Sequence, residues 1–146
     1  IELGDRKERV TSEDLPFIIS DVLGNNHPNK VKINSYVLTH SKGLKPSTSV
    51  SLQILDKIFE ENASGDGQYD AFWNALKKVY GKQKINLPKL IDYAVRIPPG
   101  SNSDALCETT ITWNSGKTNF KTRGLDSDQT VSAIKATEKM LNIIQS

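Results

Sequence analysis

Apolar and polar residues alternate in the first half of the chain before the pattern becomes helical. The alternation covers 31–40 (VKINSYVLTH) and, after a Gly-Leu-Lys-Pro turn, 47–55 (STSVSLQIL), which is typical of half-buried strands. Residues 55–57 (LDK) look like a hairpin tip that returns into IFEENAS. After GDG at 65–67, the apolar residues recur every three or four positions, at Phe72, Ala75, Leu76 and Val79. This pattern predicts three antiparallel strands and a helix, a βββα unit.

The second half repeats this order of elements with different residues. Strand-like patterns cover 90–97 (LIDYAVRI) and 105–113 (ALCETTITW), and the hairpin turn NSG at 114–116 leads into a third strand, KTNFKTRG. We expect Asp126 to open a final helix, whose apolar positions include Val131, Ile134, Leu141 and Ile144. The second half therefore predicts another βββα unit.

We predict an α+β fold in which two βββα units, about 30–80 and 88–145, pack together. The prediction rests on element order and turn chemistry, not on residue identity between the halves. Three strands and one helix bury little apolar surface alone, so each unit needs the other, or a second copy of the chain, to cover its apolar face. We therefore expect the two units to pack against each other or against a second copy of the chain.

The region before the first strand has the pattern of a connecting arm. Residues 10–24 (VTSEDLPFIISDVLG) predict a short helix with a capping-box-like pair, Thr11 and Asp14, and a stop at Gly24. We assign 1–29 to a linker subdomain that contains this one helix. Because the chain does not begin with Met, we expect it to be part of a longer polypeptide.

Charge and composition exclude some classes of partner. The 146 residues are 36% hydrophobic, and their formal charge of +2 comes from 19 bases and 17 acids scattered through the chain. No basic stripe indicates a nucleic-acid or anionic-membrane partner, and no stretch is long enough to span a bilayer. The lone Cys107 cannot form an intrachain disulfide and no leader pattern is present, which favours a cytoplasmic protein.

We find no motif for a cofactor or a metal ion. His27, His40 and Cys107 do not have the spacing of metal ligands. The chain has no G-x-S-x-G and no Walker loop, and GDGQYD lacks the third glycine of a dinucleotide fingerprint. We expect neither a metal nor a cofactor in this chain.

Two pairs of acids could be considered for acid and base catalysis: Asp104 with Glu108, and Asp126 with Asp128. Carboxylates near turns are more often helix caps or solvated groups. We expect no catalytic residues.

The two helix openings suggest a binding site for a small zwitterion. Gly65 and Gly67 permit close backbone approach and positive φ, and Asp66 or Gly67 stands at the N-cap position. The N–H groups of the first turn can hold a carboxylate. Four nearby acids could hold an ammonium group: Asp66, Asp70, Asp126 and Asp128. An apolar slot could come from Tyr69, Leu90, Tyr93 and Ile97. The alternative is that these residues are only good caps and core tyrosines.

Three motifs in this order resemble one known family. ASGDGQYDAF, LIDYAVRIPPGSNSDALCETTITW and GLDSDQTVSAIKATEKMLN are similar to the C-terminal regulatory domain of the 2-isopropylmalate, citramalate and homocitrate synthases. The resemblance covers about 30–145, and GDRKERVTSEDL resembles the subdomain that precedes it. It implies a homodimer whose effector binds near the dimer interface. It also implies that acetyl-CoA and a divalent metal belong to a catalytic barrel absent from this chain.

Carried over by motif, the resemblance implies an effector site built from the Gly-x-Gly turn, the two positions after it, the second sheet and the second helix opening. These residues are Gly65, Asp66, Gly67, Tyr69, Asp70, Leu90, Tyr93, Ile97, Ala105, Cys107, Asp126 and Gln129. Many members have a small or aliphatic residue where Tyr69 stands, and the position of Cys107 also varies. The identity of the effector therefore stays open.

On this resemblance we expect a feedback-sensing domain that binds leucine for a 2-isopropylmalate synthase. Isoleucine for an (R)-citramalate synthase is the close alternative, because a misplaced methyl is worth only ~1–3 kcal/mol in a hydrophobic pocket. An RNA-binding module is a remote alternative, since acids stand where phosphate contacts would need lysines. A pure dimerisation domain is another.

Overall fold

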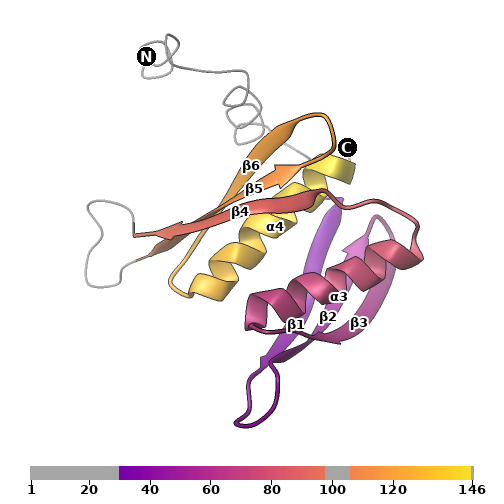
Figure 1. Ribbon diagram of the computed structural model, residues 1–146. Helices are drawn as coiled ribbons and strands as arrows, with labels where there is room; N and C mark the ends of the chain where they lie inside the picture. Colours follow the sequence, from indigo (N-terminus) through magenta and orange to yellow (C-terminus); the bar gives the residue numbers. More distant parts are fainter. Residues whose placement is uncertain (1–29, 98–105, 146) are drawn as a thin grey trace.

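The first βββα unit forms as the alternation predicts. The computed structural model describes residues 30–97 and 106–145, so the predicted linker helix within 1–29 lies outside the described residues. Three strands and a helix follow one another along the first half (Figure 1): β1 (Val31–Thr39), β2 (Ser47–Ile54), β3 (Lys57–Ser64) and α3 (Gln68–Lys82). The strands form an antiparallel sheet in the order β1-β2-β3.

The second unit has the same order of elements, which confirms the predicted α+β fold. Its elements are β4 (Lys89–Arg96), β5 (Cys107–Asn114), β6 (Asn119–Asp126) and α4 (Gln129–Gln145). Its strands form a separate antiparallel sheet in the order β4-β5-β6. Each hairpin joins neighbouring strands, so no crossover is needed within either sheet.

One predicted boundary is wrong, because Asp126 does not open the last helix. Asp126 is the final residue of β6, and α4 begins at Gln129. The Asp126 carboxylate accepts a hydrogen bond from the Asp128 N–H (2.9 Å), and the Asp128 carboxylate accepts one from the Val131 N–H (3.0 Å). The first acid therefore makes a turn and the second caps the helix.

The two units repeat each other residue by residue from the second strand of each sheet onward. In the first unit Leu52 pairs with Phe59, and in the second Trp113 pairs with Phe120. The same number of residues separates Leu52 from its counterpart Trp113 and Phe59 from its counterpart Phe120. Both helices begin with a glutamine at the matching position, 68 in α3 and 129 in α4. Sequence identity between the halves is low, but the register is the same.

The first strands of the two sheets, β1 and β4, also correspond, but with a slightly smaller sequence offset than the other elements. Both strands contain an irregularity in their pairing. The register shifts between Ile33 and Ser35 in β1, and between Leu90 and Asp92 in β4. The two bulges therefore make Ile33 and Leu90 equivalent positions. A bulge increases the local twist of a strand, so the two sheets bend at equivalent positions.

Each helix covers the inner face of its own sheet, and the two inner faces join in one core. The fully buried side chains of the first unit include Leu52, Phe72, Leu76 and Val79. Those of the second include Ile111, Trp113, Met140 and Leu141. Strand residues alternate between this core and the outer faces, as the period of two requires.

Helix α4 also joins the two units by covering the free edge of β1. Asn142 accepts a hydrogen bond from the Val31 N–H and donates one to the Val31 carbonyl, both at 2.9 Å. The Glu138 carboxylate accepts one from the Ile33 N–H at 2.8 Å. Side chains thus satisfy an edge strand that would otherwise present unpaired backbone groups. We call this contact the α4–β1 junction.

Within the described segments, neither helix has the length and apolar character needed to cross a membrane.

Candidate functional site

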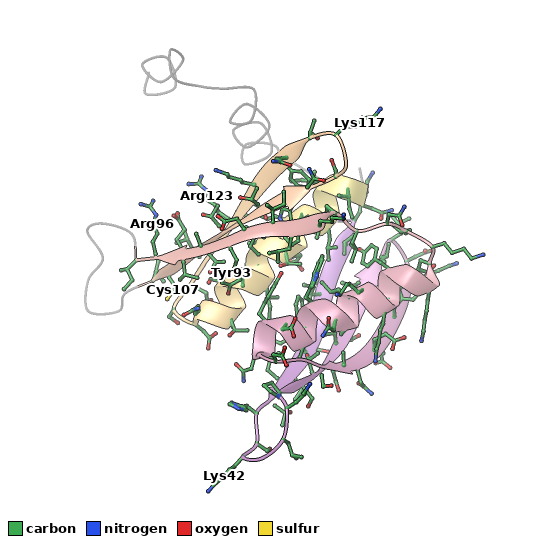
Figure 2. The ribbon with its side chains drawn as sticks, viewed as in Figure 1. Lys42, Tyr93, Arg96, Cys107, Lys117 and Arg123 are labelled. Carbon is green, nitrogen blue, oxygen red and sulfur yellow. The ribbon has the colours of Figure 1, made fainter. Side chains whose placement is uncertain are left out.

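Helices α3 and α4 begin at the same end of the molecule, at the lower left of Figure 1. Tyr93 of β4 lies between these two helix openings, on the side of the strand that faces the helices (Figure 2). Its ring lies 5.5 Å from the ring of Tyr69 on α3. Burial raises the pKa of its hydroxyl, and the side chains of Gln129 and Thr109 lower it. The Tyr69 hydroxyl forms a hydrogen bond of 2.7 Å with the Thr137 hydroxyl of α4. Residues from both units therefore meet at this end.

The opening of α3 has no side-chain cap from its N-cap residue. Gly67 is the N-cap, and a glycine offers no acceptor to the N–H groups of the first turn. The Asp70 carboxylate turns back and accepts a hydrogen bond from the Asp66 N–H at 2.8 Å. A Cβ added at Gly67 would meet no atom within 4 Å, so there is space beside this helix end. The geometry favours an anion near the first turn of α3.

The glycines at this opening do not adopt the positive φ that we expected. Gly67 has φ −141°, which is extended backbone, and the described glycines with positive φ are Gly43 and Gly116. Gly65 is needed for a different reason. A Cβ there would lie 2.6 Å from the Ala71 backbone nitrogen and from the Asp70 carboxylate. Gly65 therefore lets its own helix pack closely against the chain, whereas Gly67 leaves space outside.

The opening of α4 is rich in acids that already have partners. The pKa of Asp126 is lowered, first by the Asp128 N–H and then by the Lys135 ammonium, which lies 2.9 Å away. Asp128 is exposed and caps the helix through one carboxylate oxygen. Two acids therefore stand at each opening, but only the second helix has a side-chain cap.

Tyr36 belongs to the same region, although no motif in the sequence indicates it. Its ring meets the ring of Phe72 edge to face, with 6.3 Å between centroids. Burial raises its pKa, and the negative charges of Asp126 and Asp128 on the other unit raise it further. When the two sheets are aligned by their bulges, Tyr36 is the counterpart of Tyr93. This alignment rests on the bulges, which only the structure shows.

The remaining predicted site residues do not form one cluster. Cys107 is next to the α4 opening, with its sulfur 3.9 Å from the Ser127 carbonyl oxygen. Ile97 is 62% exposed. Leu90 lies against the far half of α3, in a hollow described below. Ala105 lies outside the described residues.

Glu108, considered above as an acid or base, is held in an ion-pair cluster on the outer face of the second sheet. Its two carboxylate oxygens lie 2.6 Å from the Arg96 Nε and 3.8 Å from an Arg123 terminal nitrogen. Figure 2 shows both arginines on the face of the sheet opposite Tyr93 and Cys107. This arrangement fits a structural ion pair, and its partner in the considered pair, Asp104, lies outside the described residues. Across residues 30–97 and 106–145, no three His, Cys, Asp or Glu side chains are grouped as a metal site would require.

Two hollows described in the structure lie away from the helix openings. One, of about 350 Å³, is lined mostly by polar residues of the first sheet, including Ser35, Ser49 and Glu60. The other, of about 540 Å³, lies between the second half of α3 and the start of β4 and includes Trp73 and Leu90.

A comparison with known families identifies this arrangement. The model of the LeuA allosteric (dimerisation) domain matches residues 9–145. The chain belongs to this family. The two βββα units described above are thus a regulatory and dimerisation scaffold, as the sequence resemblance implied.

Named relatives carry the same region within longer proteins. The chain is 29% identical to 2-isopropylmalate synthases of Aquifex aeolicus and Methanocaldococcus jannaschii, with 97% of the chain covered in each case. It is also 29% identical to a protein of Archaeoglobus fulgidus assigned as an (R)-citramalate synthase, with 98% of the chain covered. The match spans 26%, 27% and 29% of these proteins, respectively, so the chain corresponds to about a quarter of their length.

Proposed function

We propose that this chain is the feedback-sensing part of a 2-isopropylmalate synthase and that it binds leucine. The observation that carries the proposal is the pair of helix openings at one end of an allosteric-domain fold, joined through Tyr69 and Tyr93. The relatives named as 2-isopropylmalate synthases support leucine as the effector. Acetyl-CoA and a divalent metal would then belong to the catalytic region of the full enzyme, outside this chain.

In the proposed site the effector carboxylate lies at the uncapped start of α3. The N–H groups after Gly67 have no acceptor from the cap, and the positive end of the helix dipole favours an anion there. The effector ammonium lies near Asp128, because the neighbouring Asp126 already pairs with Lys135. The branched side chain packs against the rings of Tyr69 and Tyr93. One small zwitterion would thus contact both units.

We propose that binding changes the relative arrangement of the two units in a homodimer. An effector shifts a conformational equilibrium only by its differential affinity for the two states. A ligand held by α3 on one side and α4 on the other satisfies this condition, because its contacts depend on how the units are placed. The segment at 1–29 would transmit the change to the rest of the enzyme.

Thermal unfolding with and without ligand tests the proposal. Leucine at a hundred times its dissociation constant should add about 2.7 kcal/mol to the free energy of unfolding. Isoleucine and valine should add less. A larger shift with isoleucine would favour the citramalate synthase alternative, which the Archaeoglobus fulgidus relative supports. No shift with any of the three would leave a dimerisation domain without this effector.

A variant at the N-cap makes the test specific. Gly67→Asp places a carboxylate where the effector carboxylate is proposed to bind, in open space and on extended backbone. Asp is a good N-cap, so the variant should be at least as stable as the parent without ligand. Its response to leucine should be lost. Ser49→Asp adds the same charge on an exposed strand and should respond fully. Equal responses of both variants would contradict the proposed site.

A further inference from the structure

The hollow between α3 and β4 is the counterpart of the α4–β1 junction. One constant sequence offset relates Leu52 to Trp113 and the start of α3 to the start of α4. By this offset, Lys77 of α3 corresponds to Glu138 of α4, and Gly81 corresponds to Asn142. The alignment of the two bulges places Leu90 of β4 where β1 has Ile33. Lys77, Gly81 and Leu90 all line the hollow.

The residue differences explain why this second junction is open. Asn142 reaches both backbone groups of Val31, but Gly81 has no side chain to reach across. The counterpart of Val31 is Pro88, which has no N–H to donate. The first half of α3 still contacts the second sheet, since the rings of Trp73 and Trp113 lie 5.3 Å apart. The open space therefore begins beside Trp73 and extends along the second half of the helix.

The chemistry of the hollow favours a carboxylate with an apolar body. In the α4–β1 junction, the Glu138 carboxylate accepts a hydrogen bond from the Ile33 N–H. The same register directs the Leu90 N–H away from β5, and the residue that replaces Glu138 is a cation, Lys77. The ten lining residues include two lysines, Lys77 and Lys89, and no acid. A ligand carboxylate would thus meet a backbone donor and positive charge.

The wall of the hollow provides the apolar contacts. Trp73, Leu87 and Leu90 line it and are only partly buried by the protein itself. Tyr80 also lines it, and its buried hydroxyl has no hydrogen-bond partner among the described residues. A volume of about 540 Å³ is within the usual range for small-molecule sites, about 300–1,000 Å³.

We infer that this hollow is a second ligand site, which takes a small monocarboxylate with an apolar body and no ammonium group. The carboxylate occupies the place that the Glu138 carboxylate has in the other junction and binds the Leu90 N–H and Lys77. The apolar body packs against Trp73 and Leu87. The ligand would close the second junction and so restrain the two units. The effector amino acid is a poor fit here, because its ammonium would face Lys77 and Lys89.

Amide resonances of the whole 1–146 chain test the inference, with phenylacetate as the probe and the neutral phenylacetamide as its matched control. Phenylacetate should shift the Gly81 and Leu90 amides and the Trp73 indole saturably, with a dissociation constant of about 1 mM for a ligand of this size. Phenylacetamide should shift them much less, and leucine should leave Gly81 unchanged. These shifts are independent of whether leucine binds at the helix openings.

Two variants in the hollow and one outside it decide the result. Gly81→Asn supplies the missing side chain in open space and should abolish the shifts while the rest of the spectrum is kept. Lys77→Gln should weaken binding about fivefold, the value of one exposed ion pair. Lys117→Gln, at the distant β5–β6 turn of Figure 2, should have no effect. The inference is overturned if phenylacetamide acts equally, if Gly81→Asn binds like the parent, or if no shift occurs because a second copy covers the hollow.

Discussion

The two βββα units have the same strand register but differ where they meet. Equivalent positions pair in the same way within each sheet, and even the bulges of β1 and β4 correspond. The differences are at the helix openings, where Gly67 is the counterpart of Asp128, and at the junctions, where Gly81 is the counterpart of Asn142. A repeated scaffold can thus keep its packing within each unit while its contacts between units become asymmetric. The uncapped start of α3 and the open junction between α3 and β4 are the two places where we propose that ligands act.

The largest expected effect concerns the packing of helix on sheet, which differs at one equivalent pair, Ala63 and Gly124. A Cβ at Gly124 would clash with the Ser132 carbonyl oxygen and lie 2.7 Å from the Ala136 nitrogen. Because these are backbone atoms, Gly124→Ala should cost more than about 3 kcal/mol in the free energy of unfolding. The reciprocal change, Ala63→Gly, should cost only about 1 kcal/mol. Urea unfolding of both variants measures the difference.

If Gly124→Ala unfolded at the same urea concentration as the parent, α4 would not pack so closely on β6 that a Cβ at this position is excluded.

The next effect concerns the junctions. Asn142→Ala removes the hydrogen bonds to both backbone groups of Val31 and should cost about 2–3 kcal/mol, because buried partners are left unsatisfied. The variant at the equivalent position of the other junction, Gly81→Asn, should have a free energy of unfolding within about 1 kcal/mol of the parent's. Thermal unfolding in the absence of ligand gives both values. Equal losses in the two variants would mean that the junctions are energetically alike.

A smaller effect separates two buried threonines at equivalent positions. The Thr109 hydroxyl lies 2.5 Å from the Ser132 hydroxyl, whereas the Thr48 hydroxyl has no partner among the described residues. Their counterparts on the helices explain this, since Ala71 stands where α4 has Ser132. Thr109→Val should cost about 1 kcal/mol, and Thr48→Val should be neutral or stabilising by about 1 kcal/mol. Chemical denaturation of the pair tests whether the sign differs.

If Thr48→Val were instead less stable than the parent, the Thr48 hydroxyl would have a hydrogen-bond partner, such as a bound water, in the folded protein.

The smallest effect is a pH dependence that comes mainly from the first unit. Burial raises the pKa of Tyr80, whose counterpart in the second unit is Leu141. Above about pH 10 an unfolded tyrosine ionises while Tyr80 stays neutral, so the unfolded state binds fewer protons and stability falls as pH rises. Tyr80→Phe should make this fall shallower and leave stability near pH 7 unchanged or slightly higher. Unfolding followed from pH 7 to 11 tests it, and identical slopes in both proteins would assign the effect to Tyr36, Tyr69 and Tyr93.

The order of elements could be predicted because it depends on local pattern. The alternation in VKINSYVLTH and the spacing of Phe72, Leu76 and Val79 reflect the period of a strand and of a helix. The boundary at Asp126 was wrong because two acids in succession each suit a helix cap, and only the actual turn selected Asp128.

The candidate site was predicted less completely than the fold. Motifs around Tyr69 and Tyr93 named residues that do meet across the two units. Tyr36 and Thr137 were missed, because a residue that joins a site from another element leaves no mark in its own sequence neighbourhood. The effector contact at Gly65 stays a prediction, and the structure adds that a Cβ there would lie 2.6 Å from the Ala71 nitrogen.

By itself, the sequence determined two amphipathic βββα units and their turns, since the period of apolar residues and the turn residues act over a few neighbours. Tertiary structure alone decided that α4 covers the edge of β1 while the matching place beside β4 stays open. The physical reason is that these contacts join positions far apart along the chain, such as Val31 with Asn142 and Ile33 with Glu138. Whether such partners meet depends on how both sheets and both helices pack at once.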